Sequence, residues 1–224
     1  MYSLRIQLPL LVAVLVLFSC SNSDTDPDPE SNFYALAVGN SWEYKWYGVS
    51  NEGNQSVISV EENISITGVE DIGGNVFYKF SRVISGNPNG IYASIPENGE
   101  HIEYYRDSLG FLINDQGLIK FANSTNEEFP IIYYDNFGHI TDPDGGATLL
   151  GRLSNEEVVY ELENESLNCL LMTTRIEYDN GIEALANNHI YYSNGIGLVS
   201  DDIVWVASEN NAGYRRVLVN YNIP

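Results

Sequence analysis

Beyond the first 32 residues, apolar and polar side chains alternate in short runs that are separated by turn residues. In the first run, Trp42, Tyr44 and Trp46 share one face, whereas Glu43 and Lys45 share the other. An alternation with a period of two predicts a β-strand with one face in the core. This run therefore predicts the first strand of a sheet.

The same alternation recurs to the end of the chain. It predicts strands over residues 57–69, 76–84, 100–106, 110–113, 118–122, 129–134, 148–153, 158–162, 167–178, 190–192, 198–207 and 215–221. The run 129–134 is denser in apolar residues, which predicts an interior strand. The pairs Asn180-Gly181 and Asn194-Gly195 are strong hairpin signals, and the second predicts a two-residue type I′ turn.

These strands predict an all-β fold with little helix beyond the N-terminal segment. Many short strands joined by short turns are typical of an antiparallel meander. A meander of more than about ten strands tends to curl or close, because closure removes its exposed edges. We therefore expect residues 33–224 to form a single β domain, made of one antiparallel meander that is curved strongly or into a half-barrel.

The first twenty residues predict export and lipid attachment. Arg5 precedes an apolar run over residues 8–18, and the run ends in Leu17-Phe18-Ser19-Cys20. At about eleven residues the run is too short to span a bilayer, and its layout is that of a cleaved signal. The ending resembles the bacterial lipobox, which implies that residues 1–19 are a signal peptide and that Cys20 is acylated, with palmitate among its chains.

Residues 20–32 are expected to be a flexible tether from the lipidated cysteine. The stretch 21–32 holds four acidic residues, two prolines and no apolar side chain, so it buries too little surface to offset the entropy of ordering. Ser21, rather than Asp, follows Cys20, and by resemblance to enteric sorting rules this favours the outer membrane. The pattern leaves open whether the protein faces the periplasm or the cell surface of a Gram-negative bacterium.

Charge and cysteine content narrow the function classes. The formal net charge is −21, and removing the leader with its one cation makes the remainder more negative by one unit. Such a surface repels phosphate backbones, so nucleic acid is not expected as a partner. Anionic headgroups are repelled too, so the membrane is reached through the lipid anchor. Apart from Cys20 there is only Cys169, so the domain has no internal disulfide.

Three stretches carry a family resemblance. Residues 36–44 read LAVGNSWEY, residues 167–172 read LNCLLM, and residues 190–199 read IYYSNGIGLV. They are similar to the V-G-N-x-W-x-Y opening strand, the cysteine-containing strand and the Y-Y-x-x-G-x-G-L-V hairpin of secreted bacterial lipoproteins of poorly defined function. In the second stretch Glu165 or Ser166 stands where that family has glycine. The resemblance implies a curved sheet like that of periplasmic lipoprotein carriers, and no established catalytic residues.

Candidate catalytic chemistry is sparse. Cys169 could act as a nucleophile with His101, His139 or His189, but it lies in an apolar run where a thiol is typically a small buried hydrophobe. The sequence has no Gly-x-Ser-x-Gly elbow and no His-Glu-x-x-His motif. We therefore expect no catalytic residues and no enzymatic activity.

One acidic loop raises the question of a metal. Asp142 and Asp144, with Asp135 nearby, could give oxygen ligands to calcium. The spacing lacks the remaining donors of an EF-hand, and a solvated turn explains the same residues. We therefore expect no metal and no cofactor.

Two functions remain. The first is an outer-membrane-anchored lipoprotein that acts as a non-enzymatic binding or envelope-assembly module, with an envelope protein or a glycan as partner. The alternative is a carrier that holds an apolar or glycan ligand in a β concavity lined by aromatic residues. The volume left inside the sheet separates the two.

Overall fold

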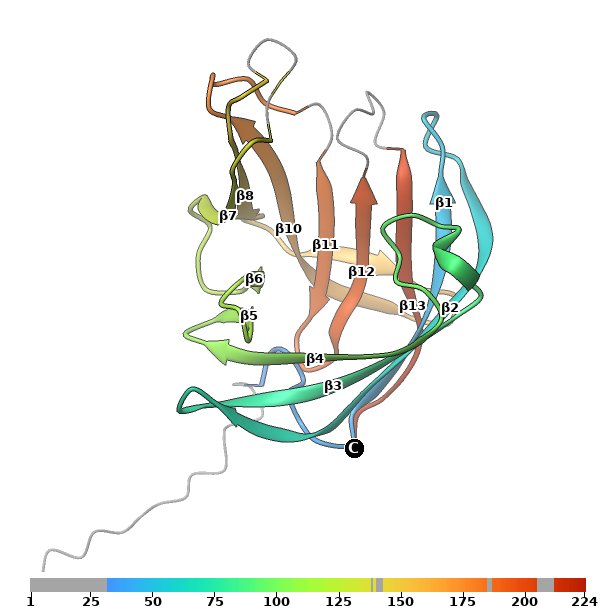
Figure 1. The fold of residues 1–224 in the computed structure, drawn as a ribbon. Coiled ribbons are helices and arrows are strands. Elements are labelled where there is room, and N and C mark those ends of the chain that lie inside the picture. Colours follow the sequence, from blue (N-terminus) through green and yellow to red (C-terminus); the bar gives the residue numbers. More distant parts are fainter. Residues whose placement is uncertain (1–31, 138, 140–142, 185–186, 205–211) are drawn as a thin grey trace, which may run out of the picture.

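The computed structural model describes residues 32–137, 139, 143–184, 187–204 and 212–224. In these residues every strand belongs to one hydrogen-bonded sheet, and all strand pairs are antiparallel (Figure 1). The all-β prediction is confirmed. The only helical segment in this part of the chain is a short 3-10 turn, η2 (Pro88–Gly90), between the third and fourth strands.

The N-terminal half forms a meander in which each strand pairs with the next. Its strands are β1 (Ser41–Val49), β2 (Gln55–Ile72), β3 (Asn75–Ser85), β4 (Gly99–Ser108), β5 (Phe111–Asn114) and β6 (Ile119–Ala122). β2 and β3 form a long hairpin. Their pairing runs from Glu61 opposite Ser85 to Ile72 opposite Asn75, with one register shift.

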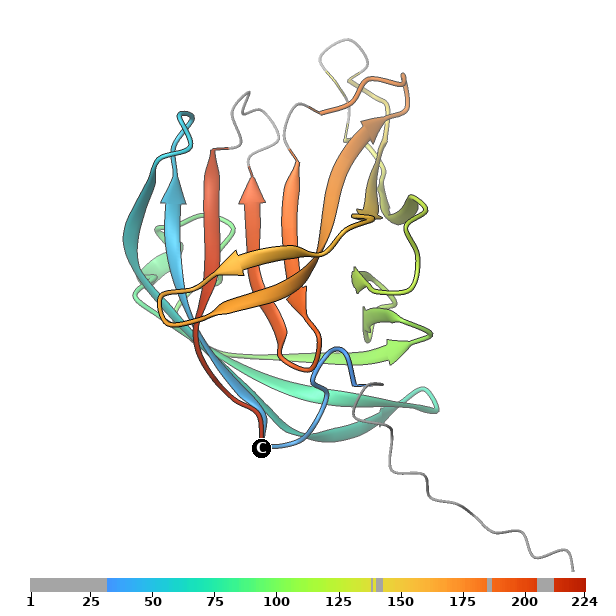
Figure 2. The ribbon, with the colours of Figure 1, turned by 180° about the vertical axis from the view of Figure 1, so that it is seen from behind.

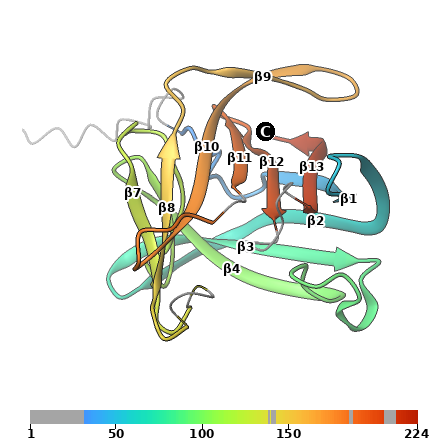
Figure 3. The same cartoon turned by 90° about the horizontal axis from the view of Figure 1, so that it is seen from above.

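The C-terminal half repeats this arrangement with one exception. Its strands are β7 (Phe129–Tyr134), β8 (Ala147–Leu153), β9 (Val158–Glu161), β10 (Ser166–Tyr178), β11 (Asn188–Ser193), β12 (Gly197–Val204) and β13 (Gly213–Asn222). β9 pairs only with the first residues of β10. Figures 2 and 3 show that this hairpin crosses outside β11, β12 and β13, and the rings of Tyr160 and Tyr191 meet there at 4.9 Å.

The two halves join through the first and last strands. β1 pairs with β2 on one side and with β13 on the other, so the sheet order is β6-β5-β4-β3-β2-β1-β13-β12-β11-β10-β8-β7. Seen from above, the strands form a ring (Figure 3). The ring is nearly closed. Its end strands β6 and β7 do not pair with each other, but the ring of Phe111 on β5 meets that of Phe129 on β7 at a centroid distance of 5.4 Å.

Irregularities in pairing bend the sheet. The register shifts between Lys45 and Tyr47 against β2, between Glu43 and Tyr44 against β13, and between Ile66 and Gly68 against β3. Bulges of this kind increase local twist and turn a strand through a corner. Further shifts occur in the β5–β6, β7–β8 and β11–β12 pairs, so such bends recur along the sheet and help it to curve around its inner face.

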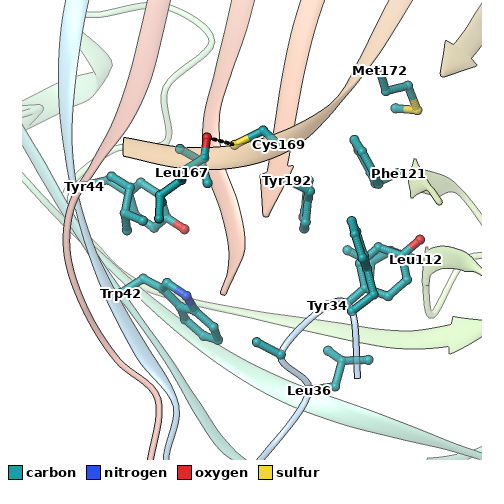
Figure 4. Packing of buried hydrophobic residues seen from close by; sticks show 14 of the residues in the cluster. Tyr34, Leu36, Trp42, Tyr44, Leu112, Phe121, Leu167, Cys169, Met172 and Tyr192 are labelled. Atoms are coloured by element: carbon teal, nitrogen blue, oxygen red, sulfur yellow. Dashed lines mark hydrogen bonds between the residues drawn. The ribbon is translucent and has the colours of Figure 1, made fainter. Parts of the chain in front are cut away.

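Aromatic side chains fill one end of the barrel. Trp42, Tyr44 and Trp46 are buried as the alternation predicts. The chain before β1 also enters the core, where Tyr34 packs edge to face on Tyr192 at 5.8 Å and on Phe121 at 6.3 Å (Figure 4). Residues 33–36, all buried, therefore close this end of the barrel.

Two predictions of detail are wrong. Phe129–Tyr134 is an edge strand and not an interior one, since it pairs only with β8 and no residue of it is fully buried. Asn194-Gly195 does not make a two-residue type I′ turn. Ser193 pairs with Gly197, which leaves three loop residues, and only Gly195, with φ of 73°, is left-handed among them. This φ pattern, with the Ile196 amide donating to the Ser193 carbonyl, is that of a type II turn.

We expect Gly195→Val to lower the free energy of unfolding by about 1 to 3 kcal/mol, because a β-branched residue is strained at that φ. Added Cβ atoms at Gly195 and at Gly68 both meet nothing within 4 Å, but Gly68 has no positive φ. Gly68→Val is therefore the matched control and should change stability by less than about 0.5 kcal/mol. Urea denaturation measures both, and equal losses would contradict a backbone role for Gly195.

Candidate functional site

A cavity of about 300 Å³ lies on the inner face of the curved sheet. One wall comes from β1 to β4, where Phe80 and Tyr105 line it. The opposite wall comes from β11 to β13, where Ile190 and Ile203 line it. Several labelled residues of Figure 4, among them Trp42, Tyr44 and Tyr192, belong to this lining. The volume is at the lower end of the range of about 300 to 1,000 Å³ that is typical of small-molecule sites.

The apolar part of the wall is aromatic. Phe80 stacks on Trp42 with ring centroids 6.2 Å apart and meets the ring of Tyr105 edge to face at 5.1 Å. The indole Nε1 of Trp42 donates to the Ile196 carbonyl at 2.6 Å, and the Tyr44 hydroxyl donates to the Leu198 carbonyl at 2.8 Å. The Trp42 side chain is therefore fixed to the β11–β12 connection, and the Tyr44 side chain to the start of β12.

The polar part of the wall is organised by Glu62, whose side chain is fully buried. Its carboxylate accepts hydrogen bonds from Trp46 Nε1 at 2.9 Å, from Arg216 Nη1 at 2.8 Å, and from both Nε and Nη2 of Arg82. Three strands, β1, β3 and β13, thus bring donors to one carboxylate on β2. A buried carboxylate is costly unless its lone pairs are satisfied in this way.

Arg216 is held from two further sides. Its Nε and Nη2 atoms both donate to the Asp201 carboxylate at 2.8 Å, which is a bidentate pair. Its guanidinium carbon lies 5.2 Å from the centroid of the Tyr44 ring and 5.5 Å from that of Trp46. Cation–π attraction and two carboxylates therefore keep this guanidinium in the wall of the cavity.

Arg82 forms the other branch of the network. Its Nη1 donates to Glu103 at 3.2 Å, and the second oxygen of Glu103 accepts from the Tyr105 hydroxyl at 2.7 Å. The Arg82 and Glu103 side chains are 13% and 35% exposed, so this branch reaches the accessible part of the cavity. The network therefore presents charged groups to a ligand while Glu62 remains behind them.

Electrostatics keep the network ionised. Burial disfavours the charged form of Glu62, but the positive charges of Arg216 and Arg82 outweigh burial and lower the pKa of its carboxyl. Burial also disfavours the charged form of Arg216, and here the charges of Asp201 and Glu62 prevail and raise its pKa. Burial raises the pKa of Tyr44, so its hydroxyl remains a donor at neutral pH.

The loop between β3 and β4 covers part of the cavity and contributes Ser94 and Pro96 to its lining. The buried side chain of Asn87 shapes this loop by donating to the carbonyls of Tyr92, Ile95 and Pro96 at 3.3, 2.9 and 3.0 Å. Ile95 packs with the second core cluster, which includes Trp46. The loop is thus fastened by its own hydrogen bonds and by one apolar anchor.

The structure does not support Cys169 as a nucleophile. Its side chain is fully buried, its Sγ lies 3.6 Å from the Leu167 carbonyl, and burial, with the charge of Glu157, raises the pKa of the thiol to about 11. A catalytic cysteine needs a lowered pKa. The three histidines make other contacts: His101 with the Glu97 carbonyl, His139 with the Tyr178 ring and His189 with Asp202.

The calcium hypothesis gains no support from geometry. Asp142 lies outside the described residues, and so its side chain cannot be placed. Among the residues that are described, Asp135 and Asp144 included, no group of three or more His, Cys, Asp or Glu side chains could hold a metal ion.

The N-terminal predictions also fall outside the described part of the chain. The signal peptide over residues 1–19, the acylation site Cys20 and the tether up to residue 31 are in this category, as are residues 205–207 of the predicted strand 198–207. Within the described ranges, no helix has the length and apolarity needed to cross a bilayer.

The glycines and aromatic residues of the quoted motifs have architectural roles. Gly39 and Gly197 have φ of 100° and 97°, and Trp42 and Tyr192 are buried. Trp42, Tyr192 and Gly197 also line the cavity. The motif residues are therefore part of the candidate site as well as of the fold.

The charged network was not predicted, although the sequence contains a signal for it. On β2 the inward positions read Val60, Glu62, Ile64 and Ile66, so Glu62 interrupts an apolar face. Arg82 follows Phe80 in the same way on β3. Charged residues at inward positions of neighbouring strands indicate a paired buried cluster, because an unpaired buried charge is too costly.

Comparison with known proteins gives a fold likeness only. No protein-family model matches the sequence, and no curated protein matches it. A crystal structure of a candidate lipoprotein from Parabacteroides distasonis aligns with 85% of this chain and 98% of its own, at 12% identity and a TM-score of 0.48. A candidate exported protein with a YmcC-like fold from Bacteroides fragilis covers the same shares at 9% identity and a TM-score of 0.46. At these values neither description transfers to this chain.

We expect Glu62→Gln to lower the free energy of unfolding by about 3 to 5 kcal/mol at pH 7, because it leaves two guanidiniums that are only 13% and 12% exposed short of one negative charge. Glu61→Gln is the matched control, since Glu61 is adjacent on β2 and exposed. It should cost less than about 0.5 kcal/mol.

The effect of Glu62→Gln should depend on pH. Since the folded-state pKa of Glu62 is depressed, its contribution is complete above the unfolded carboxyl pKa of about 4.3 and is lost as the pH falls through the folded-state value. The difference in free energy of unfolding between wild type and variant should therefore stay constant from about pH 7 to 5 and narrow below about pH 4. A difference that widens on acidification would show that folding raises the pKa of Glu62 instead of lowering it.

Proposed function

We propose that this protein is an exported lipoprotein, anchored at the outer membrane of a Gram-negative bacterium through Cys20, whose β domain binds a small molecule without converting it. The leader ending in Leu17-Phe18-Ser19-Cys20 and the acidic tether support the anchor. The cavity of about 300 Å³ supports binding, and it is the observation that favours a ligand-binding module over one that acts only through its surface.

The chemistry of the cavity supports a binding role over catalysis. Each carboxylate of the network is engaged by a guanidinium, and the pKa of Glu62 is lowered, so this group is a poor general acid or base at neutral pH. Charges fixed by mutual hydrogen bonds serve better to orient a ligand.

Assembly with an envelope protein is the second candidate, because β7 offers an edge. Within the described residues β7 pairs only with β8, and Tyr133 on it is 52% exposed. An unpaired strand edge can accept a strand from another protein. Under this alternative the cavity would be dispensable.

Cys20→Ala should abolish incorporation of labelled palmitate when the full chain is expressed in a Gram-negative host. The reason is that the thiol of the lipobox cysteine is the acylated group. Cys169→Ala, which changes the other cysteine of the mature chain, should leave labelling intact. Persistent labelling of the Cys20 variant would rule out the proposed anchor.

Filling the cavity should abolish ligand binding. We expect a fragment mixture to give saturation-transfer NMR signals with wild type, and Ile190→Trp, which places an indole in the cavity, to weaken binding at least about tenfold. Val83→Trp is the control, at a residue that is 43% exposed and outside the cavity lining. Equal binding by both variants would place the function at a surface such as the edge of β7.

A further inference from the structure

We propose that the ligand of the inner cavity is an uncharged saccharide, a ring compound whose hydroxyl groups meet the Arg82–Glu103 and Arg216–Asp201 pairs. This inference rests on the proposed function, because it names the chemical class of the molecule that the cavity takes. Three properties of the wall carry it: its balance of charge, its pattern of donors and acceptors, and its aromatic rings beside the charged pairs.

The charges of the site cancel. The carboxylates of Glu62, Glu103 and Asp201 oppose the cations Arg82, Arg216 and Lys120, which lines the cavity from β6. A ligand anion would approach guanidiniums whose charge is already matched, and it would lie beside the carboxylates of Glu103 and Asp201. A ligand cation would approach carboxylates whose charge is already matched, and it would lie beside the guanidiniums. Either ion would lose its hydration without gaining an opposite charge that is free to pair with it. The site therefore favours a neutral ligand.

The hydrogen-bonding groups suit hydroxyls. A guanidinium has five N–H donors, and Arg82 and Arg216 each use three of them on carboxylates, which leaves two on each. Glu103 and Asp201 keep further acceptor positions beside these donors. A hydroxyl donates and accepts at once, so several hydroxyls on one ring can satisfy both kinds of group.

An acyl chain fits this wall poorly. It would cover the Arg82–Glu103 pair, which is partly accessible, and displace water from the free donors and acceptors of that pair without returning any hydrogen bond. The apolar contacts that a sugar needs are smaller, since the C–H face of its ring packs on one aromatic ring. Arg216 covers Tyr44 and Trp46. Among the other rings that line the cavity, Phe80 and Tyr105 lie beside the Arg82–Glu103 pair, so a sugar ring bonded to this pair would pack on them.

Saturation-transfer NMR on the purified β domain with its tether and no lipid tests the proposal with a charge series on one ring. The probes are methyl glucoside, glucuronic acid and glucosamine, which are neutral, anionic and cationic, with methyl mannoside and methyl galactoside as further neutral rings and dodecanoate as the acyl probe. We expect at least one neutral glycoside to bind, and to bind better than either charged analogue.

Glu103→Gln tests the role of the accessible carboxylate. We expect the affinity for the neutral glycoside to fall at least about tenfold, because a charge-assisted hydrogen bond is lost. Glucuronic acid should bind better than to wild type, since the wall then carries one net positive charge. Glu128→Gln is the matched control: Glu128 is 36% exposed and is paired with Arg175 outside the cavity lining, so it should change neither affinity.

Phe80→Leu gives a second test that leaves the charges in place. It should weaken the neutral glycoside about tenfold by removing the stacking ring, whereas Phe137→Leu, at an exposed residue outside the cavity lining, should not. Binding of dodecanoate that Ile190→Trp abolishes, with no glycoside bound, would overturn the saccharide class and keep the binding function. If no probe binds, and Ile190→Trp weakens the binding of no fragment, both the saccharide class and the binding function of the cavity are wrong.

Discussion

The buried carboxylate of Glu62 is the constraint on which the inner face of the barrel depends. It lies on β2, near the middle of the sheet order, and four hydrogen bonds from Trp46, Arg82 and Arg216 converge on it. An ion so deeply buried is tolerated only with such partners. The partners come from strands far apart in the sequence, so the network requires β1, β2, β3 and β13 to be adjacent. It therefore ties the joining of the two chain halves to the formation of the cavity wall.

Around this network the fold divides the barrel into a filled end and an open one. Aromatic packing of residues 33–36 against Phe121 and Tyr192 fills one end. The β9–β10 hairpin supports β11 to β13 from outside, and the β3–β4 loop covers part of the cavity. The cavity is the space that remains between these elements. Its polar and aromatic side chains lie side by side in one wall, because the period of two places Arg82 next to Phe80 on one strand face.

The strands were predictable, and their partners were not. Alternation located β7 at its observed bounds and placed Trp42, Tyr44 and Trp46 in the core, because burial of one face is encoded locally. Pairing of β1 with β13 depends on contacts across the whole chain, which a period of two does not specify. The volume of the cavity was not readable for a related reason: it is what side chains from many strands leave unfilled. Glu62 could have been found as a charged residue in an apolar face, but its partners on β3 and β13 required the topology.

The most direct test of this account is the titration of Glu62 by carbon-13 NMR of its side-chain carboxyl in the folded protein. If Arg82 and Arg216 both hold it, the resonance will titrate below the ordinary glutamate range, and its midpoint will rise when Arg216 is replaced by Gln. A midpoint at or above the ordinary value of about 4.3 would mean that burial prevails over the two guanidiniums. The cavity wall would then lack the fixed charges on which the binding role depends.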